Sequence, residues 1–291
     1  MKSPIRWIGG KFYLVPHLLK LIPKHHCYVE VFGGGAQLLF GKPPSKVEIY
    51  NDIDQNLVNF YRVLRDPEKY KKLVFLLELT PYSRLEWKTA LQKLRNREGD
   101  DIERAYCFYY LIITCFNAFL TDKEAGGFSY SNSKNLPLTY FSKLPNFPQF
   151  HTRIKNVIVE NLDYREILKK YDSPETFFYL DPPYLITTRS RNQLYTHELN
   201  TPEEHQELCE NILKLQGKVL LSGYDNEIYN SYLKNWNTQE YETKIWCQFK
   251  PKLKNIIEKV WFNYPEPIPN LFQNTTKKQE EKDENGKLPQ L

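Results

Sequence analysis

Sulfur and glycine are scarce in this chain, and long apolar runs are missing. Its 291 residues include one methionine, five cysteines and twelve glycines. No two cysteines have the C-x-x-C spacing of many zinc and redox sites, and an odd number cannot all pair within one chain. We therefore expect no metal site, and we expect reduced, mostly buried thiols of an intracellular protein. The cysteines are Cys27, Cys107, Cys115, Cys209 and Cys247.

Signals for membrane insertion or secretion are also missing. The longest apolar run, CFYYLIITCF at 107–116, is too short to span a bilayer and predicts a buried helix. The start, MKSPIRW, carries charge but lacks the apolar segment of a secretory signal. We expect a protein with no membrane partner.

Two phosphate-binding motifs, G-x-G-x-x-G and G-K-[ST], do not occur, which disfavours a cofactor with a pyrophosphate. The formal net charge is +5, and the last nineteen residues add nothing to it, since they hold four lysines and four acids. This modest basic excess permits a polyanionic partner without proving one.

The apolar fraction of 41%, with 15% aromatics, is enough for a sizeable core. Candidate strands at 28–32 and 46–52 flank a glycine-rich turn, and Asp54 can cap the helix that follows. This βαβ pattern predicts a parallel sheet. Its later elements are strands at 156–164, 177–180 and 218–224, a helix started by Thr201, Pro202 and Glu204, and a closing antiparallel pair at 242–249 and 256–264.

Residues 66–150 differ in character, because helical patterns dominate there. One candidate helix begins with Ser83 and Glu86 at capping-box spacing. Residues 119–134, FLTDKEAGGFSYSNSK, predict a hairpin or mobile loop. We expect one discontinuous α/β domain, 1–65 and 151–266, a helical insertion, 66–150, and a disordered tail, 267–291, of which the part after Phe272 is dispensable.

The stretch FFYLDPPY, residues 177–184, ends a buried strand with a carboxylate, two prolines and a tyrosine. Ligands of open α/β sheets bind at the carboxyl ends of the strands. The prolines make a stiff rim with free carbonyls. With Asp181 before it and Tyr184 after it, this rim suits a flat group with donors in its plane, such as a nucleobase amino group. The plainer alternative is a proline turn after a strand.

Residues 32–36, FGGGA, allow close approach of the backbone to a ligand at a helix N-terminus, although structural turns use glycine too. Asp52 ends the next strand, where dinucleotide folds place an acid that accepts ribose hydroxyls. A helix-capping or solvated acid is the alternative. A nucleoside cofactor without a pyrophosphate fits these features, and S-adenosylmethionine is one whose sulfonium benefits from nearby carboxylates.

Taken in order from about residue 3 to 266, these motifs resemble the Dam-type DNA adenine methyltransferases. The final glycine of the family's F-x-G-x-G motif is replaced by Ala36. The segments that carry the resemblance are RWIGGK (6–11), YVEVFGGGA (28–36), YNDID (50–54), CFNAF (115–119), GGF (126–128), ENLDY (160–164), DPPY (181–184) and IIEKVWFNYP (256–265).

The resemblance implies a Rossmann-like, S-adenosylmethionine-dependent methyltransferase sheet with a mostly helical DNA-recognition insertion. The implied reaction moves a methyl group from S-adenosylmethionine to the 6-amino group of adenine in double-stranded DNA, after base flipping. The implied setting is the cytoplasm of a bacterium, an archaeon or a phage-infected cell, in a restriction-modification or regulatory role. Enzymes of this family can work as monomers, and no obligate protein partner is evident.

The resemblance also implies roles for particular residues. The Asp181 carboxylate and the Pro182 carbonyl would accept the amino hydrogens of the target base, which frees the nitrogen lone pair for attack, and Tyr184 would stack on the base. The implied catalytic residues are Asp181, Pro182, Pro183 and Tyr184. The implied cofactor residues are Trp7, Lys11, Phe32, Gly33, Gly35, Asp52, Asp163, Tyr164 and Asp181. Individually, Trp7 could be a core aromatic, Lys11 a surface charge and Asp163 a helix cap.

Other amino-group methylations use the same tetrad, so transfer to cytosine in DNA, to an RNA base or to protein glutamine stays open, as does non-catalytic binding of nucleic acid. The family commonly places a basic residue and an asparagine just after F-N-G, whereas in the turn LTDKEAGG here Asp122 and Glu124 flank Lys123. We therefore expect a recognition sequence other than G-A-T-C, unless this turn is only a solvated loop. The candidate DNA contacts are Lys123, Ser129, Ser131, Asn132 and Lys134.

Overall fold

The computed structural model describes residues 1–7, 9–116, 120–121, 125–185, 199–246 and 253–267. Within them, seven strands form one sheet in the order β3-β2-β1-β4-β5-β7-β6. Neighbours from β3 to β5 are parallel, and β7 is antiparallel to β5 and β6, which confirms the predicted sheet and its closing pair. The strands are β1 (Cys27–Glu30), β2 (Val47–Asn51), β3 (Ile158–Glu160), β4 (Thr176–Leu180), β5 (Lys218–Tyr224), β6 (Asn237–Trp246) and β7 (Leu253–Phe262).

The strand order reverses between β1 and β4. The connection after β1 leads to β2 on one side, whereas the connection after β4 leads to β5 on the other. In an open α/β sheet such a reversal leaves a crevice at the carboxyl ends of the two strands, where ligands bind. The fold is thus a Rossmann-like α/β fold, as predicted, with a defined place for a site.

Alternate residues of the central strands face opposite layers, as the period of a strand requires. Tyr28 and Phe177 belong to the hydrophobic cluster of one face, and Val29 and Phe178 to that of the other. Every residue of β4 is buried, because helices cover both faces. The first layer contains α1 (Val15–Leu21), α2 (Gln37–Gly41) and α3 (Gln55–Arg65), and the second contains α9 (Tyr164–Tyr171), α10 (Pro202–Ile212) and α11 (Glu227–Tyr232).

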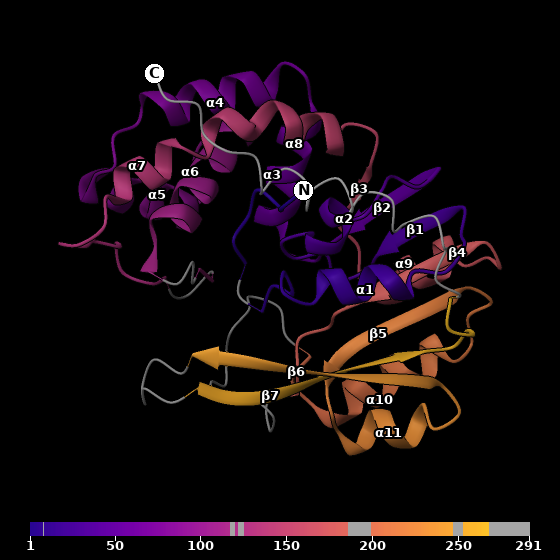
Figure 1. The fold of residues 1–291 in the computed structure, drawn as a ribbon. Helices are drawn as coiled ribbons and strands as arrows, with labels where there is room; N and C mark the ends of the chain where they lie inside the picture. Colours follow the sequence, from indigo (N-terminus) through magenta and orange to yellow (C-terminus); the bar gives the residue numbers. More distant parts are fainter. Residues whose placement is uncertain (8, 117–119, 122–124, 186–198, 247–252, 268–291) are drawn as a thin grey trace, which may run out of the picture.

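The chain between α3 and β3 adds further helices over the first layer. Leu73, Phe108 and Ile154 of these helices belong to the same hydrophobic cluster as Phe60 of α3, so the core is continuous. Figure 1 shows them gathered beyond α3, on one side of the sheet. Their treatment as a separate recognition unit stays a proposal. They are α4 (Lys69–Leu79), α5 (Arg84–Arg95), α6 (Asp101–Thr114), α7 (Leu136–Phe141), η2 (Leu144–Asn146) and α8 (Phe147–Ile154).

The helix starts confirm two predictions and correct one. Asp54 caps α3, and Thr201 and Glu204 form a complete capping box on α10. The capping box predicted at Ser83 is wrong. The Ser83 hydroxyl accepts from the Leu85 N–H, and the Ser83 N–H donates to the Tyr110 hydroxyl, so that donor is already used.

The predicted hairpin is confirmed in its described residues. Cys115 bridges Phe128, and Leu120 bridges Ala125, both antiparallel. Residues 117–119, 122–124 and 268–291 lie outside the described residues, and so do the candidate contact Lys123, Cys247 and nearly all of the tail. No helix among the described residues is long and apolar enough to cross a membrane.

Candidate active site

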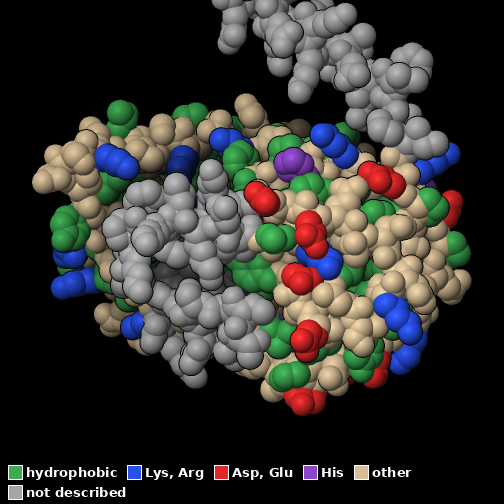
Figure 2. Space-filling model, turned by 60° about the horizontal axis from the view of Figure 1, so that its bottom comes forward, with side chains coloured by type: hydrophobic (Ala, Val, Ile, Leu, Met, Phe, Trp, Pro, Cys, Tyr) green, Lys and Arg blue, Asp and Glu red, His purple; other side chains and the backbone are tan. Residues whose placement is uncertain are grey.

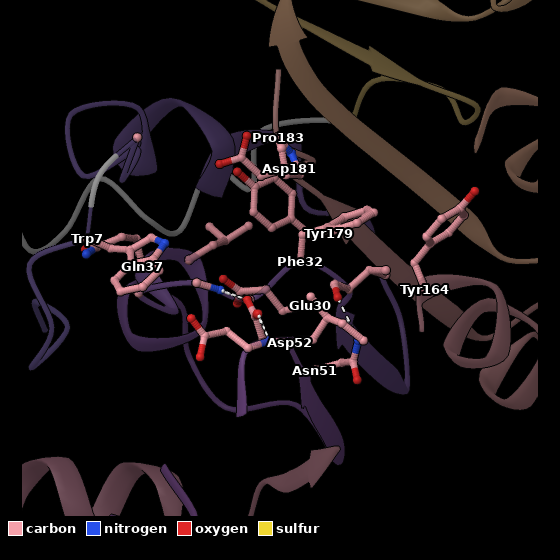
Figure 3. A pocket seen from close by; sticks show the side chains of 18 of the residues that line it. Trp7, Glu30, Phe32, Gln37, Asn51, Asp52, Tyr164, Tyr179, Asp181 and Pro183 are labelled. Carbon is pink, nitrogen blue, oxygen red and sulfur yellow. Dashed lines mark hydrogen bonds between the residues drawn. The ribbon is translucent and has the colours of Figure 1, made fainter. Parts of the chain in front are cut away.

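A pocket of about 370 Å³ opens at the carboxyl ends of β1, β2 and β4, where the fold places a crevice. All nine residues predicted to hold a cofactor line it, although they come from five separate parts of the sequence. Figure 3 shows Asp181 and Pro183 on one side of this pocket and Asp52 on the other, with Trp7 and Gln37 at a third edge. The nine are Trp7, Lys11, Phe32, Gly33, Gly35, Asp52, Asp163, Tyr164 and Asp181.

The glycine-rich turn after β1 needs its glycines because Trp7 and Tyr50 pack against it. Added at Gly33, a Cβ would overlap the Tyr50 ring, and added at Gly35 it would lie 2.9 Å from the Trp7 Cβ. Gly34 has a φ of +46°, which side chains disfavour. The turn therefore presents bare backbone to the pocket, with Trp7 as its outer wall.

Asp52 braces this turn rather than capping a helix. One carboxylate oxygen accepts from the Gly34 N–H at 2.7 Å, and the other accepts from the Asp54 N–H at 2.8 Å. Burial and the nearby Asp54 charge raise the pKa of Asp52 to about 7, although these hydrogen bonds oppose the shift. A carboxylate offers about four lone-pair sites, so Asp52 can still accept from a ligand hydroxyl.

Glu30 is a second buried carboxylate in the lining, and the sequence analysis missed it. It accepts from the Tyr28 hydroxyl at 2.8 Å and from the Leu39 N–H at 2.9 Å. Burial raises the pKa of Glu30 to about 8. A negative charge at Glu30 is thus disfavoured unless a cation or a donor occupies the pocket.

The opposite wall combines a helix start with two aromatic rings. Asp163 caps α9 by accepting from the Arg165 N–H at 2.9 Å, so the structural alternative for Asp163 is correct and yet the residue also lines the pocket. The rings of Phe32 and Tyr164 lie 5.6 Å apart. Asn51 ties this wall to the sheet through hydrogen bonds to Val31 and Leu162.

Asp181 comes directly after β4 and is partly exposed to the pocket. It accepts from the Ser222 hydroxyl at 3.0 Å, and its Oδ1 lies 3.3 Å from the Lys11 Nζ. Burial raises the pKa of Asp181, the Lys11 ammonium lowers it, and the Glu258 charge raises it. Lys11 is 3% exposed, so it is a site residue rather than a surface charge.

The other residues of the tetrad differ in position. Pro183 lines the pocket, whereas Pro182 and Tyr184 are not part of its wall. The Tyr184 ring lies 4.3 Å from the Tyr224 ring and 4.6 Å from the Lys11 Nζ. Its hydroxyl donates to Glu258 at 2.9 Å.

The described candidate DNA contacts are close together in the sequence, and none of them lines this pocket. Ser129 is partly buried and pairs with Thr114 through its backbone. The Ser131 hydroxyl accepts from the Ser133 and Lys134 N–H groups, so it shapes a turn. Asn132 and Lys134 are exposed. The structure adds a neighbour that the sequence did not suggest, Arg84 of α5, whose guanidinium lies 4.9 Å from the Phe128 ring and 5.7 Å from the Tyr130 ring.

The polar residues that sequence reasoning missed share a signal, which is a polar side chain inside an apolar strand. Glu30 ends β1, Asn51 ends β2, Ser222 lies in β5 and Glu258 in β7, and all four are buried. Within the described residues, no group of His, Cys, Asp and Glu side chains could hold a metal ion.

Comparison with known proteins decides the family. Residues 7–246 match the family model of D12 class N6 adenine-specific DNA methyltransferases. The chain belongs to this family. The matched range includes Trp7, the glycine-rich turn, the hairpin and the DPPY tetrad.

Proteins named as methyltransferases are similar over most of the chain. The type II methyltransferase M1.LlaDCHI of Lactococcus lactis subsp. cremoris is 27% identical over 252 residues, which are 81% of this chain and 86% of that protein. The type II methyltransferase M.MjaIII of Methanocaldococcus jannaschii is 25% identical over 291 residues, 91% of this chain and 99% of that protein. The DNA adenine methylase of Escherichia coli is 24% identical over 231 residues, 76% of this chain and 80% of that protein.

As a D12 class methyltransferase, the chain is an enzyme that methylates adenine in DNA, which confirms the predicted family and the predicted target base. Cytosine, RNA bases and glutamine, which the tetrad alone left open, are disfavoured by this membership.

Proposed function

We propose that this D12 class methyltransferase takes its methyl group from S-adenosylmethionine and transfers it to the 6-amino group of an adenine flipped out of duplex DNA. The observation that carries the proposal is the single pocket that joins the nine candidate cofactor residues and has Asp181 in its wall.

The charge of the pocket fits this methyl donor. Bound S-adenosylmethionine supplies an electrophilic methyl group on a positively charged sulfur. Six carboxyl groups and two cations line the pocket, and a bound cation would favour ionisation of Glu30 and Asp52, so the lining suits a cationic ligand. These groups are Glu30, Asp52, Asp54, Asp163, Asp181 and Glu204, against Lys11 and Arg165.

The lining residues can divide the binding of this donor among them. Asp52 would accept hydrogen bonds from ribose hydroxyls, as the acid at this strand end does in dinucleotide folds. Asp163 and Tyr164 would lie near the adenine ring of the donor. Trp7 and Lys11 close the opposite part of the pocket, and both come from the segment before α1.

Asp181 and the Pro182 carbonyl would hold the target base. An adenine amino nitrogen is a poor nucleophile because its lone pair is delocalised into the ring. Two acceptors in the ring plane can bind both hydrogens and thereby localise the lone pair, so orientation and fixed electrostatics supply most of the rate gain. The ring of Tyr184 would stack on the base, and the base has to leave the duplex to reach this position.

The hairpin and the start of α5 would contact the DNA. We keep Lys123, Ser129, Asn132 and Lys134 as candidate contacts, with Ser131 as the residue that shapes their turn, and we add the exposed Arg84. A second cavity of about 240 Å³, lined in part by Leu120 and Thr121 of the hairpin, shares Asp54 with the main pocket. This proximity supports a role of the 66–150 insertion in DNA recognition.

Incubation with methyl-labelled S-adenosylmethionine and duplex DNA of mixed sequence, followed by nucleoside analysis, tests the proposal. We expect label in N6-methyladenine and none when the Asp181→Ala variant is used. Label in a cytosine derivative, or transfer to RNA but not to duplex DNA, would contradict it.

A further inference from the structure

Glu258 of β7 is 1% exposed, and three donors converge on it. Its Oε2 accepts from the Lys11 Nζ at 2.7 Å and from the Tyr184 hydroxyl at 2.9 Å. Its Oε1 accepts from the Tyr13 hydroxyl at 2.8 Å. One carboxylate thus joins the segment before α1, the DPPY tetrad and the closing strand of the sheet.

Strand register fixes this carboxylate in place. Glu258 pairs with Tyr224 in the antiparallel β5–β7 ladder, and directly paired residues point to the same face. Tyr224 in turn lies against the ring of Tyr184. A slip of one residue would turn Glu258 to the opposite face, so the fold specifies its approach to the tetrad.

Lys11 lies between two carboxylates at unequal distances. Its Nζ is 2.7 Å from Glu258 and 3.3 Å from Asp181. With Glu258 as the nearer partner, the ammonium does not pair fully with Asp181. The Asp181 oxygens consequently stay available to an amino group.

We propose that Glu258 is a positioning residue for methyl transfer, which holds Lys11 back from Asp181 and fixes the ring of Tyr184. The inference rests on the roles proposed above for Asp181 and Tyr184. A buried ion pair is often no more stabilising than apolar residues of similar volume, so fold stability alone does not account for this arrangement.

Several titratable groups face Asp181, and Glu258 and Lys11 act on it in opposite directions. The Glu258 charge raises the pKa of Asp181, whereas the Lys11 ammonium lowers it. The groups are Lys11 and Tyr13 before α1, Glu30 on β1, Tyr179 on β4, Tyr224 on β5, Tyr229 on α11 and Glu258 on β7.

Glu258→Gln keeps the volume and removes the charge, so it separates positioning from packing. We expect kcat to fall about 100-fold, as for a small misplacement of reacting groups, with little change in the KM for DNA. Activity requires ionised Asp181. Its pKa should fall when the negative charge of Glu258, which raises it, is removed. The acid limb of the pH profile should therefore move to lower pH.

Crystal structures of the wild type and of Glu258→Gln give a readout that does not depend on turnover. We expect the distance from Lys11 Nζ to Asp181 to shorten from 3.3 Å toward the 2.7 Å that now separates Lys11 from Glu258. An unchanged distance would overturn the inference, even if the wild type transferred no methyl group and the proposed function failed.

Glu48→Gln is the matched control, since Glu48 is also a buried strand carboxylate with two cationic partners, Lys42 and Arg153, but lies outside the pocket wall. We expect it to lower the melting temperature without moving the acid limb or kcat per folded molecule. If Glu258→Gln behaved in the same way, with kcat within about threefold of wild type, Glu258 would be structural and the inference wrong.

Two further variants separate the charge of Glu258 from its hydrogen bond to Tyr184. Glu258→Asp retains the charge, so it should keep the acid limb in place while kcat is reduced, and it replaces Glu258→Gln if that variant does not fold. Tyr184→Phe removes the same hydrogen bond from the other side. Its effect and that of Glu258→Gln should be non-additive in kcat, and additive effects would contradict a shared role.

Discussion

Asp181 has one cation and one hydroxyl as close neighbours, and these decide what its removal does. Lys11 keeps Glu258 as its nearer partner at 2.7 Å, so the loss of Asp181 leaves no unpaired buried cation. We expect Asp181→Ala to lower the rate of methyl transfer at least about 1000-fold, because an oriented acceptor is lost. The melting temperature should stay unchanged. Label transfer in a single turnover and thermal unfolding measure the two, and activity within about tenfold of wild type would contradict the assignment.

Tyr184 contributes a hydroxyl as well as a ring. Stacking alone would make Tyr184→Phe nearly silent, but the hydroxyl donates to Glu258 at 2.9 Å. A hydrogen bond to a charged acceptor is worth about 1.5–3 kcal/mol, so we expect Tyr184→Phe to lower kcat by about tenfold or more. Tyr184→Ala should be worse, since it also removes the ring. Equal activity of wild type and Tyr184→Phe would show that the hydroxyl has no role.

The two raised carboxyl pKa values in the pocket make binding of the donor pH-dependent. The pKa of Asp52 is about 7, because of burial and the Asp54 charge, and only the ionised form can accept at every lone pair. A ligand whose hydroxyls donate to Asp52 must first displace its proton at lower pH. We therefore expect the Kd of S-adenosylmethionine to fall by up to about tenfold per pH unit as the pH rises toward 7.

Isothermal titration calorimetry at several pH values measures this dependence. Asp52→Asn should remove most of the change in Kd near pH 7. A smaller change in Kd near pH 8 should remain, because burial raises the pKa of Glu30 to about 8. Glu30→Gln should have the converse effect. A Kd that is constant with pH in the wild type would rule out a hydrogen-bonding role for ionised Asp52.

Folding stability should depend on pH in the opposite direction from ligand affinity. The folded-state pKa of Asp52 is raised from 3.8 to about 7, so between these values the folded protein holds a proton that the unfolded chain releases. The free energy of unfolding of the ligand-free protein should therefore decrease as pH rises through this window. Denaturant melts measure it, and Asp52→Asn should reduce the slope; an unchanged slope would show that Asp52 ionises normally in the folded state.

Residues in contiguous motifs could be located from the sequence, whereas partners from distant strands could not. Trp7, Asp52 and Asp181 lie in recognisable segments, and the structure brings them to one pocket. Ser222 and Glu258 reach Asp181 and Lys11 only because of how β5 and β7 pair. Strand register depends on the whole sheet, so a local pattern does not reveal it.

At the scale of elements, regular sequence patterns predicted the sheet and the helices α3, α6 and α10. The sequence analysis did not predict the short helices that carry an early proline. α1, α7 and α8 each carry a proline at their first or second position. Proline there starts a helix, but in a sequence it equally indicates a break. Tertiary packing of apolar residues such as Leu18 and Phe147 decides between the two.

The start of α5 and the second arm of the hairpin form one unit. The Tyr82 hydroxyl donates to the Ser129 carbonyl at 2.8 Å, and Arg84 lies over the rings of Phe128 and Tyr130. Tyr130 is 78% exposed, so the guanidinium is held over aromatic rings at the surface. A preorganised guanidinium of this kind suits a phosphate or a guanine edge.

We expect Arg84→Ala to weaken binding of a substrate duplex about tenfold or more, with kcat at saturating DNA little changed. Arg84→Lys should not restore binding, because an ammonium lacks the planar fork. Lys169→Ala, which removes an exposed charge from α9 on the other side of the sheet, is the matched control. Equal loss of affinity in Arg84→Ala and Lys169→Ala would show a general effect of charge rather than a contact.

At the scale of the whole molecule, charge alone does not explain DNA recognition. The net charge of +5 is small, and on the face in Figure 2 Lys and Arg side chains lie mostly around the edge while Asp and Glu side chains form a row across it. Non-specific phosphate attraction scales with the number of such contacts. We therefore propose that specific contacts of the insertion select the site.

The composition of the hairpin predicts a recognition sequence other than G-A-T-C. Its turn, LTDKEAGG, places acids beside a single lysine, and the nearest described guanidinium at the second arm comes from α5 instead. A guanidinium from another element approaches DNA from a different position, so it is expected to contact a different base pair. Methylation of a random-sequence duplex library, followed by mapping of the modified adenines, measures the site. In Arg84→Ala we expect one position of that site to lose about 1–3 kcal/mol of discrimination. A wild-type site of G-A-T-C, or a site unchanged in Arg84→Ala, would show that this unit does not set specificity.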